Sequence, residues 1–170
     1  VGTWSNYSGT ILSTISNKLN VSIATANGTF RQENSQQAGE YYAYLEYDTG
    51  VHSINSISIR TFLDNTQTNI YQMGNSLGIS KGSLSIINNF SSFNLLGFRI
   101  TIGSSTDVNI LIDNIKLFNV SQMKLKGIKN DDGILFANLT NEEIKSQLDI
   151  WVKNGFPTVV EKLVSKSDNL

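Results

Sequence analysis

The sequence predicts a mainly β protein, a two-sheet antiparallel β-sandwich with a C-terminal hairpin and helix appendage. Three observations support this prediction. Asn, Ser and Thr make up 54 of the 170 residues, and these short polar side chains favour turns and exposed strand faces over helix interiors. Apolar and polar residues alternate in short segments of the first 120 residues, which is typical of half-buried strands. Gly, Asn or Asp separates these segments, and no helical pattern lies between them.

Seven segments carry this alternation. The predicted strands are Asn20–Ala26, Glu40–Tyr47, Ser56–Leu63, Asn69–Met73, Ser83–Ile87, Leu95–Ile102 and Val108–Phe118. Seven or more strands at this spacing are typical of a sandwich of two antiparallel sheets.

The composition changes near Val120–Met123. Residues 1–120 hold 13 charged residues, whereas the 50 residues that follow hold 14, and 13 of the 16 aromatic residues precede the change. We therefore predict a sandwich over residues 1–120 and a small charged α/β appendage, or linker to a next module, over residues 121–170.

Two patterns predict the structure of the appendage. Met123–Lys126 and Ile134–Leu139 flank a turn sequence, which predicts a hairpin. Thr140 and Glu143 then match a capping box, and apolar residues follow at helical spacing, so we expect a helix over Asn141–Lys153. The segment from residue 158 to residue 166 fits either a short second helix or a strand.

The strand Glu40–Tyr47 predicts its own orientation. Successive strand residues point to opposite faces, and an unpaired carboxylate in the core is strongly unfavourable, so Glu46 must face outward. Tyr42 and Tyr44 then face outward with it. The inward set is Tyr41, Ala43, Leu45 and Tyr47.

The same reasoning on Ser56–Leu63 turns Ser58, Arg60 and Phe62 outward and buries Ile57, Ile59 and Leu63. Outward aromatic rings beside charged groups suit a sugar, because pyranose C–H faces stack on aromatic planes and hydroxyls bond to carboxylate or guanidinium groups. An exposed Trp4, near Tyr7, would add a second stacking platform. The candidate ligand-binding residues are Tyr42, Tyr44, Glu46, Arg60, Phe62 and Trp4.

Purely structural roles are the alternative to ligand binding for these residues. The outward tyrosines could cover the sheet edge, pack under a loop or meet a neighbouring domain, and Trp4 could close the open end of the sandwich. Either alternative would leave the rings unavailable to a ligand.

Several function classes find no support in the sequence. The formal charge is −1 and 16% of residues are charged, which disfavours nucleic-acid binding and membrane adsorption, and no apolar run is long enough for membrane insertion. There is no cysteine, and the single histidine, His52, excludes a His-cluster zinc site and gives little support for a catalytic triad. The carboxylates Glu33, Glu46, Asp48 and Asp64 could pair for glycoside hydrolysis, but solvated strand faces and turns explain them better.

The final predicted strands resemble the closing strands of jelly-roll carbohydrate-binding modules of the family 4, 9 and 22 type. The resemblance lies in Gly97–Ile102 and in Val108–Leu117, which contains Asp113-Asn114-Ile115. Upstream, Phe30–Glu33 and Ala38–Tyr41 look like a paired strand and the strand entry of these modules, with Ala38 in place of proline.

This resemblance, over roughly residues 4–119, implies a jelly roll that binds a glycan on a concave sheet or on loops at one edge. It also implies a structural calcium ion at Asp113, although the acidic N-terminal strand that completes such a site is missing here. Modules of this type occur in secreted glycosidases and in phage tail or baseplate adhesins. The chain begins with Val1 rather than Met, and we expect it to be a segment of a longer polypeptide.

We therefore expect a non-catalytic module that binds a polysaccharide or cell-surface glycan, outside the cell or on a virion surface. One alternative is a structural or assembly module of a phage tail or cell-surface fibre, in which the outward aromatics meet another module or a second copy of the chain. A glycosidase or lyase on the same sandwich is a further alternative.

Overall fold

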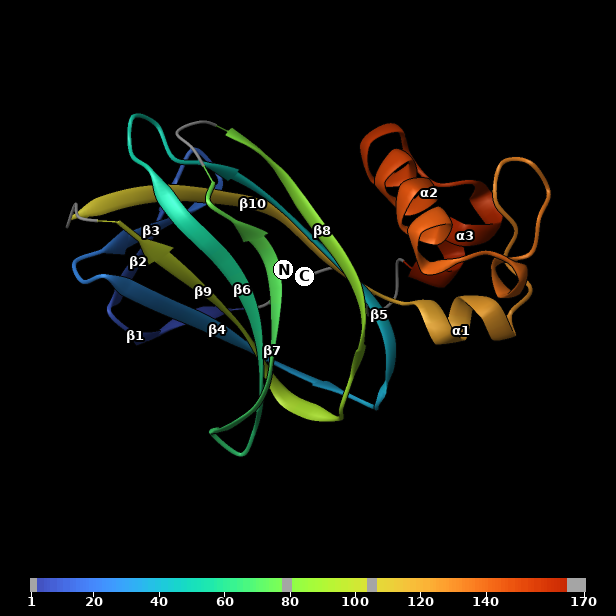
Figure 1. The fold of residues 1–170 in the computed structure, drawn as a ribbon, viewed down its shortest axis with the longest axis horizontal. Helices are drawn as coiled ribbons and strands as arrows, with labels where there is room; N and C mark the ends of the chain where they lie inside the picture. Colours follow the sequence, from blue (N-terminus) through green and yellow to red (C-terminus); the bar gives the residue numbers. More distant parts are fainter. Residues whose placement is uncertain (1–2, 78–80, 104–106, 165–170) are drawn as a thin grey trace.

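The computed structural model describes residues 3–77, 81–103 and 107–164. Within these ranges, ten strands form two five-stranded antiparallel sheets that face each other, and three α-helices follow at the C-terminal end (Figure 1). The predicted mainly β, two-sheet sandwich is confirmed.

The strands divide evenly between the two sheets. Sheet A has the order β1 (Trp4–Ser8), β4 (Asn27–Gln36), β9 (Phe93–Ile102), β6 (Ile54–Leu63) and β7 (Thr66–Asn75). Sheet B has the order β2 (Thr10–Ile15), β3 (Lys18–Ile23), β10 (Val108–Asn119), β5 (Gly39–Asp48) and β8 (Lys81–Phe90). Because the chain repeatedly crosses from one sheet to the other, residues far apart in sequence meet on each face.

Each of the seven predicted strands corresponds to a strand of the structure. The structure adds β1 and β2, which the alternation did not reveal, and β4, which only the family resemblance indicated. Most residues of β1 and β2 are exposed, and an edge strand with little buried surface has almost no hydrophobic period to detect.

The first hydrophobic core fills the space between the sheets. Phe30 and Phe98 stack there with ring centroids 5.8 Å apart, and Tyr41, Ala43 and Leu45 of β5 are buried among the same residues. The inward register predicted for these three residues of β5 is therefore correct. Tyr47, at the end of the strand, is half-buried against this core.

The predicted hairpin after residue 122 is wrong. Strand β10 ends at Asn119, and helix α1 (Val120–Leu125) begins at once, with the Asn119 side chain accepting a hydrogen bond from the Gln122 backbone N–H at 3.0 Å. Helical spacing lets Val120 and Met123 be buried together. Of the predicted hairpin, the turn at 130–133 and one isolated bridge between Lys129 and Leu135 are present.

The later helices follow the sequence signals closely. Helix α2 (Asn141–Asn154) starts at the predicted capping box, in which Thr140 and Glu143 exchange hydrogen bonds of 3.0 and 3.2 Å. It ends at Gly155, whose φ of 101° is strained for residues with a Cβ. For the segment from residue 158 to residue 166, the sequence fitted either a helix or a strand. The helix is correct: α3 covers Thr158–Val164, and residues 165–166 lie outside the described residues.

A second hydrophobic core lies between sheet B and the helices. Tyr42 and Phe118, from β5 and β10, stack at 5.8 Å and are fully buried. Ile144, Leu148 and Trp151 supply the apolar face of α2. The three helices consequently lie against the side of sheet B that points away from sheet A (Figure 1).

Among the helices in the described ranges, none has the length and apolar character needed to cross a membrane.

We expect the two cores to unfold together, because β5 contributes buried side chains to both. Trp4 packs against the first core and Trp151 belongs to the second, so Trp4→Phe and Trp151→Phe proteins each retain one fluorescent reporter. In each protein, guanidinium unfolding followed by tryptophan fluorescence and by far-UV circular dichroism should give the same midpoint. Trp151→Ala should lower the free energy of unfolding by about 3–5 kcal/mol.

A Trp151 transition in the Trp4→Phe protein that precedes the circular-dichroism transition would contradict a single cooperative unit.

Candidate functional site

The outward tyrosines of β5 are covered. Tyr42 and Tyr44 point out of sheet B as the sequence predicts, but their exposed fractions are 0% and 2%, because the C-terminal helices pack over them. The prediction that these rings are exposed for stacking is wrong. The alternative in which they meet a neighbouring structural unit describes the structure.

The phenol groups of both tyrosines are fixed by hydrogen bonds to carboxylates. The Tyr42 hydroxyl donates to Asp149 of α2 at 2.5 Å, and the same carboxylate oxygen accepts from Ser85 at 2.7 Å. The Tyr44 hydroxyl donates to Glu46 at 2.7 Å. Burial, followed by the Asp149 bond, raises the pKa of Tyr42 far above its ordinary value. Burial and the Glu46 bond raise the pKa of Tyr44 to about 12.

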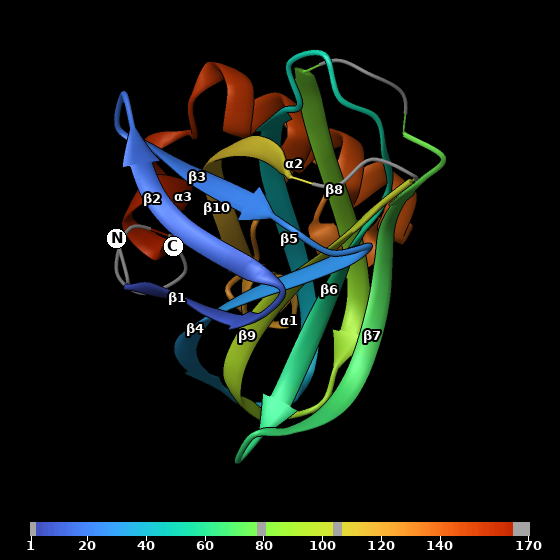
Figure 2. The same ribbon diagram turned by 90° about the vertical axis from the view of Figure 1, so that its left-hand side faces the viewer.

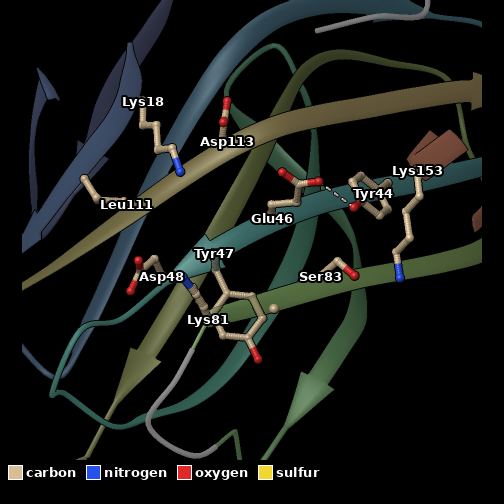
Figure 3. Close-up of a pocket in the computed structure, with 11 residues that line it drawn as sticks. Lys18, Tyr44, Glu46, Tyr47, Asp48, Lys81, Ser83, Leu111, Asp113 and Lys153 are labelled. Carbon is tan, nitrogen blue, oxygen red and sulfur yellow. Dashed lines mark hydrogen bonds between the residues drawn. The ribbon is translucent and has the colours of Figure 1, made fainter. Parts of the chain in front are cut away.

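A polar pocket of about 340 Å³ lies beside these tyrosines on the outer face of sheet B. Figure 3 shows Tyr44 and Glu46 joined by a hydrogen bond within it. Around them the pocket brings together charges of both signs: Lys18, Lys81, Lys153, Glu46, Asp48 and Asp113. The Tyr44 ring is almost fully buried and the other ring that lines the pocket, Tyr47, is half-buried, so this pocket offers mainly hydrogen bonds and charges to a ligand.

The carboxylates of this pocket do not fit a calcium site. Calcium takes six to eight oxygen ligands, usually with several carboxylates, yet no group of three or more acidic or histidine side chains gathers anywhere in the described ranges. Asp113 instead accepts a hydrogen bond of 2.8 Å from the backbone N–H of Asn114, which has a φ of 51°. Asn114 in turn donates to Glu46 at 3.2 Å. Asp113 thus supports the irregularity in the β5–β10 pairing.

The second candidate surface is the outer face of sheet A, on the side of the molecule away from the helices (Figure 2). In the register of this sheet, Arg31 of β4 and Arg60 of β6 are paired with Gly97 of β9 from its two sides. Arg99 follows two residues along β9, and so lies on the same face. We call this surface the arginine face and define it by Tyr7, Arg31, Arg60, Phe62, Gly97 and Arg99.

Aromatic rings and a guanidinium group pack together on the arginine face. The Arg31 guanidinium carbon lies 4.3 Å from the Tyr7 ring centroid and 5.6 Å from that of Phe62. The two rings meet edge to face at 5.3 Å. Phe62 faces outward as predicted but is only 1% exposed, whereas Tyr7 is 45% exposed. Tyr7 is therefore the ring on this face that a ligand can reach, and Phe62 supports it from beneath.

The remaining predicted ligand-binding residues, Arg60 and Trp4, lie in different parts of the structure. Arg60 is half-buried on the arginine face, whereas Trp4 packs edge to face against Phe30 at 5.4 Å and closes the sandwich, as its alternative role required. Leu63, predicted inward, is 44% exposed. The strand pairing is irregular between Thr61 and Phe62, just before it, and Thr61 is the last buried inward residue.

The guanidinium groups of this face lack carboxylate partners. Both ion pairs of the described residues use lysine, Lys124 with Glu40 and Lys145 with Asp149. Buried nitrogen atoms of Arg31 (Nη1) and Arg60 (Nε) have no hydrogen-bond partner. Burial, together with the nearby charge of Arg99, lowers the pKa of Arg60. The half-buried guanidinium groups of Arg31, Arg60 and Arg99 give this face its positive charge.

The outer face of sheet A offers little support for hydrolytic chemistry. Glu33 is the only carboxylate carried by the strands of sheet A, whereas glycoside hydrolysis commonly uses two. His52 lies in the turn between β5 and β6, where its backbone N–H donates to the Thr49 carbonyl at 3.1 Å. Within the described ranges, its ring forms no hydrogen bond to a serine or a carboxylate.

Solved carbohydrate-binding modules share this fold. A CBM22-1 xylan-binding domain of Xyn10C from Paenibacillus barcinonensis aligns with a TM-score of 0.51 and 9% identity, over 67% of this chain and 83% of that chain. A CBM4 structure aligns with a TM-score of 0.50 and 13% sequence identity, over 67% of this chain and 84% of that chain. The structure of the CBM22-1 and GH10 modules of Clostridium thermocellum xylanase 10B aligns with a TM-score of 0.51 and 15% sequence identity, over 67% of this chain and 25% of that chain.

The resemblance to jelly-roll carbohydrate-binding modules is therefore confirmed for the fold. No protein-family model and no curated protein sequence matches the chain.

Stability should fall as the pH rises from about 10 to about 12. An unfolded tyrosine ionises near pH 10, whereas folded Tyr44 keeps its proton until about pH 12, so the unfolded state binds fewer protons in this window and is favoured as the pH rises. Urea unfolding at several pH values between about 9 and about 11.5 measures this slope, and Tyr44→Phe should make it shallower. An identical slope in wild type and variant would contradict the raised pKa.

A side chain at residue 97 should disturb the arginine face. An added Cβ would lie 2.8 Å from Cε2 of Phe62, closer than van der Waals contact allows. We expect Gly97→Ala to lower the free energy of unfolding by about 1–3 kcal/mol. In a double-mutant cycle with Phe62→Leu, the combined loss should be smaller than the sum of the two single losses. Strict additivity would show that the Phe62 ring does not lie over residue 97.

Proposed function

We propose that the protein is a non-catalytic carbohydrate-binding module whose ligand lies across the arginine face. The observation that carries this proposal is the exposed ring of Tyr7, which packs on the Arg31 guanidinium and the buried Phe62 ring on the outer face of sheet A. Sugar rings bury their apolar C–H surface on such a ring. The shared fold of solved carbohydrate-binding modules supports the same function.

The arrangement of sheet A also supplies hydrogen-bonding groups around the ring. Ser58 pairs with Arg99 across β6 and β9, and its hydroxyl donates to the Gln72 side chain at 3.1 Å. Arg60 donates to Gln67 from the neighbouring strand. Hydroxyls, amides and guanidinium groups on this sheet can exchange hydrogen bonds with the hydroxyls of a sugar chain.

Sheet B is a poorer surface for a long glycan. Its outer face carries the helices over Tyr42 and Phe118. The parts left open are the polar pocket around Glu46 and the strands β2 and β3, which line a separate pocket. A chain of sugars needs a continuous path, and the residues of the arginine face lie on four adjacent strands of sheet A, β1, β4, β9 and β6. With a glycan as ligand, the protein would act outside the cell or on a virion surface, and a role in assembly through the same face remains the alternative.

A polysaccharide screen by affinity electrophoresis, followed by calorimetry on each hit, tests the proposal. Tyr7→Ala should weaken binding at least about tenfold, which corresponds to about 1.4 kcal/mol, and Tyr7→Phe should retain most of it because stacking needs only the ring. Leu125→Ala, which removes a side chain 79% exposed on α1, serves as the control and should bind as wild type does.

The variant Glu46→Gln separates the two surfaces. It alters the pocket of Figure 3 and leaves the arginine face intact. Lost binding in Glu46→Gln with full binding in Tyr7→Ala would move the ligand to that pocket. Release of reducing sugar from any bound polysaccharide would overturn the non-catalytic assignment.

A further inference from the structure

The arginines of this chain are all on one face. The sequence contains three arginines and ten lysines. Arg31, Arg60 and Arg99 all lie in strands of sheet A, and no strand of sheet A contains a lysine. The lysines belong to sheet B, at positions 18, 81 and 116, or follow residue 123. The two kinds of cation are therefore segregated by sheet.

The register places the three arginines around Gly97 of β9. Adjacent strands are about 4.8 Å apart, so β4 and β6, on either side of β9, place the backbones of Arg31 and Arg60 about 10 Å apart. Arg99 lies about 7 Å along β9 from Gly97. Because residue 97 has no side chain, the Phe62 ring lies over it, and the strand positions of the three arginines flank this point.

These cations have no internal neutralisation. The sheet contributes one carboxylate, Glu33, which is exposed and forms no ion pair within the described ranges. Arg31 and Arg60 are half-buried and keep buried N–H groups without partners. Gathering like charges costs free energy in the unbound protein, and an anion bound to the accessible atoms of these guanidinium groups would relieve that cost.

We propose that the ligand of the arginine face is an anionic polysaccharide, whose carboxylate or sulfate groups bind Arg31, Arg60 and Arg99 while a sugar ring packs on Tyr7. This inference rests on the proposed carbohydrate-binding function and names the class of sugar. The planar guanidinium fork matches carboxylate and sulfate oxygens with two parallel hydrogen bonds, which a lysine ammonium cannot offer.

Polysaccharide is a better match than nucleic acid for this face. Proteins that bind nucleic acid through its phosphates commonly neutralise about 6–10 of them, whereas this face has three cations in a chain whose formal charge is −1. A single exposed ring, Tyr7, suits a single sugar better than a row of stacked bases.

Matched polymers test the charge requirement. Polygalacturonate is compared with the fully methyl-esterified polymer, and dextran sulfate with dextran, by calorimetry and affinity electrophoresis. At least one anionic polymer should bind about tenfold or more tightly than its neutral partner, and added salt should weaken it because the charges are solvent-accessible. The first pair reports carboxylate recognition and the second reports sulfate recognition.

Three variants and a matched control locate the charges. Arg60→Gln and Arg99→Gln should each weaken binding of the anionic polymer about tenfold or more, and Arg60→Lys should recover only part of the loss because the fork is missing. Lys116→Gln removes one positive charge from sheet B and should bind as wild type does. Thermal unfolding of each variant verifies that it folds, and Arg99→Gln remains informative where Arg60→Gln is unstable.

The failures are distinguishable. Equal binding of charged and neutral polymers, with loss in Tyr7→Ala, would overturn the anionic ligand and leave carbohydrate binding intact. Tighter binding of a single-stranded oligonucleotide than of either anionic polymer would overturn the inference in favour of nucleic acid. No binding to any polysaccharide of the screen would remove both the inference and the proposed function.

Discussion

Strand β5 contributes buried side chains to both hydrophobic cores, and the packing of the two sheets and of the helices depends on it. Its odd-numbered residues Tyr41, Ala43 and Leu45 fill the sandwich, while Tyr42 and Tyr44 fill the space beneath the helices. The polar groups of a strand that is buried on both faces need hydrogen-bond partners within the protein. The Tyr42 bond to Asp149 and the Tyr44 bond to Glu46 do so for the two phenols.

This double burial decides which sheet remains available to a ligand. The helices cover one side of the sandwich, and the aromatic residues that look most like a sugar platform in the sequence are those that hold the helices in place. The opposite sheet keeps an open face whose chemistry is set by Tyr7 and three arginines. The outer face of sheet B therefore packs against the helices, whereas the outer face of sheet A faces the solvent.

Local rules predicted much of this structure, and they failed where burial depends on distant residues. The alternation in β5 gave the correct inward residues, and the capping box at Thr140 located the start of α2, because both signals act within a few residues. The burial of Tyr42 required knowledge that α2, about 100 residues later, packs on it. The sequence shows that α2 has an apolar face, but it does not say which surface that face covers.

The site was only partly predictable for the same reason. Arg60 and Phe62 were placed on the correct face by alternation, but the burial of Phe62 depends on Tyr7 and Arg31, which come from two other strands. Strand β1 has almost no buried surface, so nothing in its own composition marked Tyr7 as the exposed ring. The shared position of the three arginines emerges only from strand order.

The segregation of arginine from lysine bears on how such a protein can change. The residues that anchor the helices and those that line the open face belong to different sheets, which pack against each other through the sandwich core. Substitutions among the outward residues of β4, β6 and β9 alter charge and shape without touching a helix contact. A lineage could thus exchange one polymer specificity for another while inheriting the same stable scaffold, and a protein engineer could randomise that face with the same freedom.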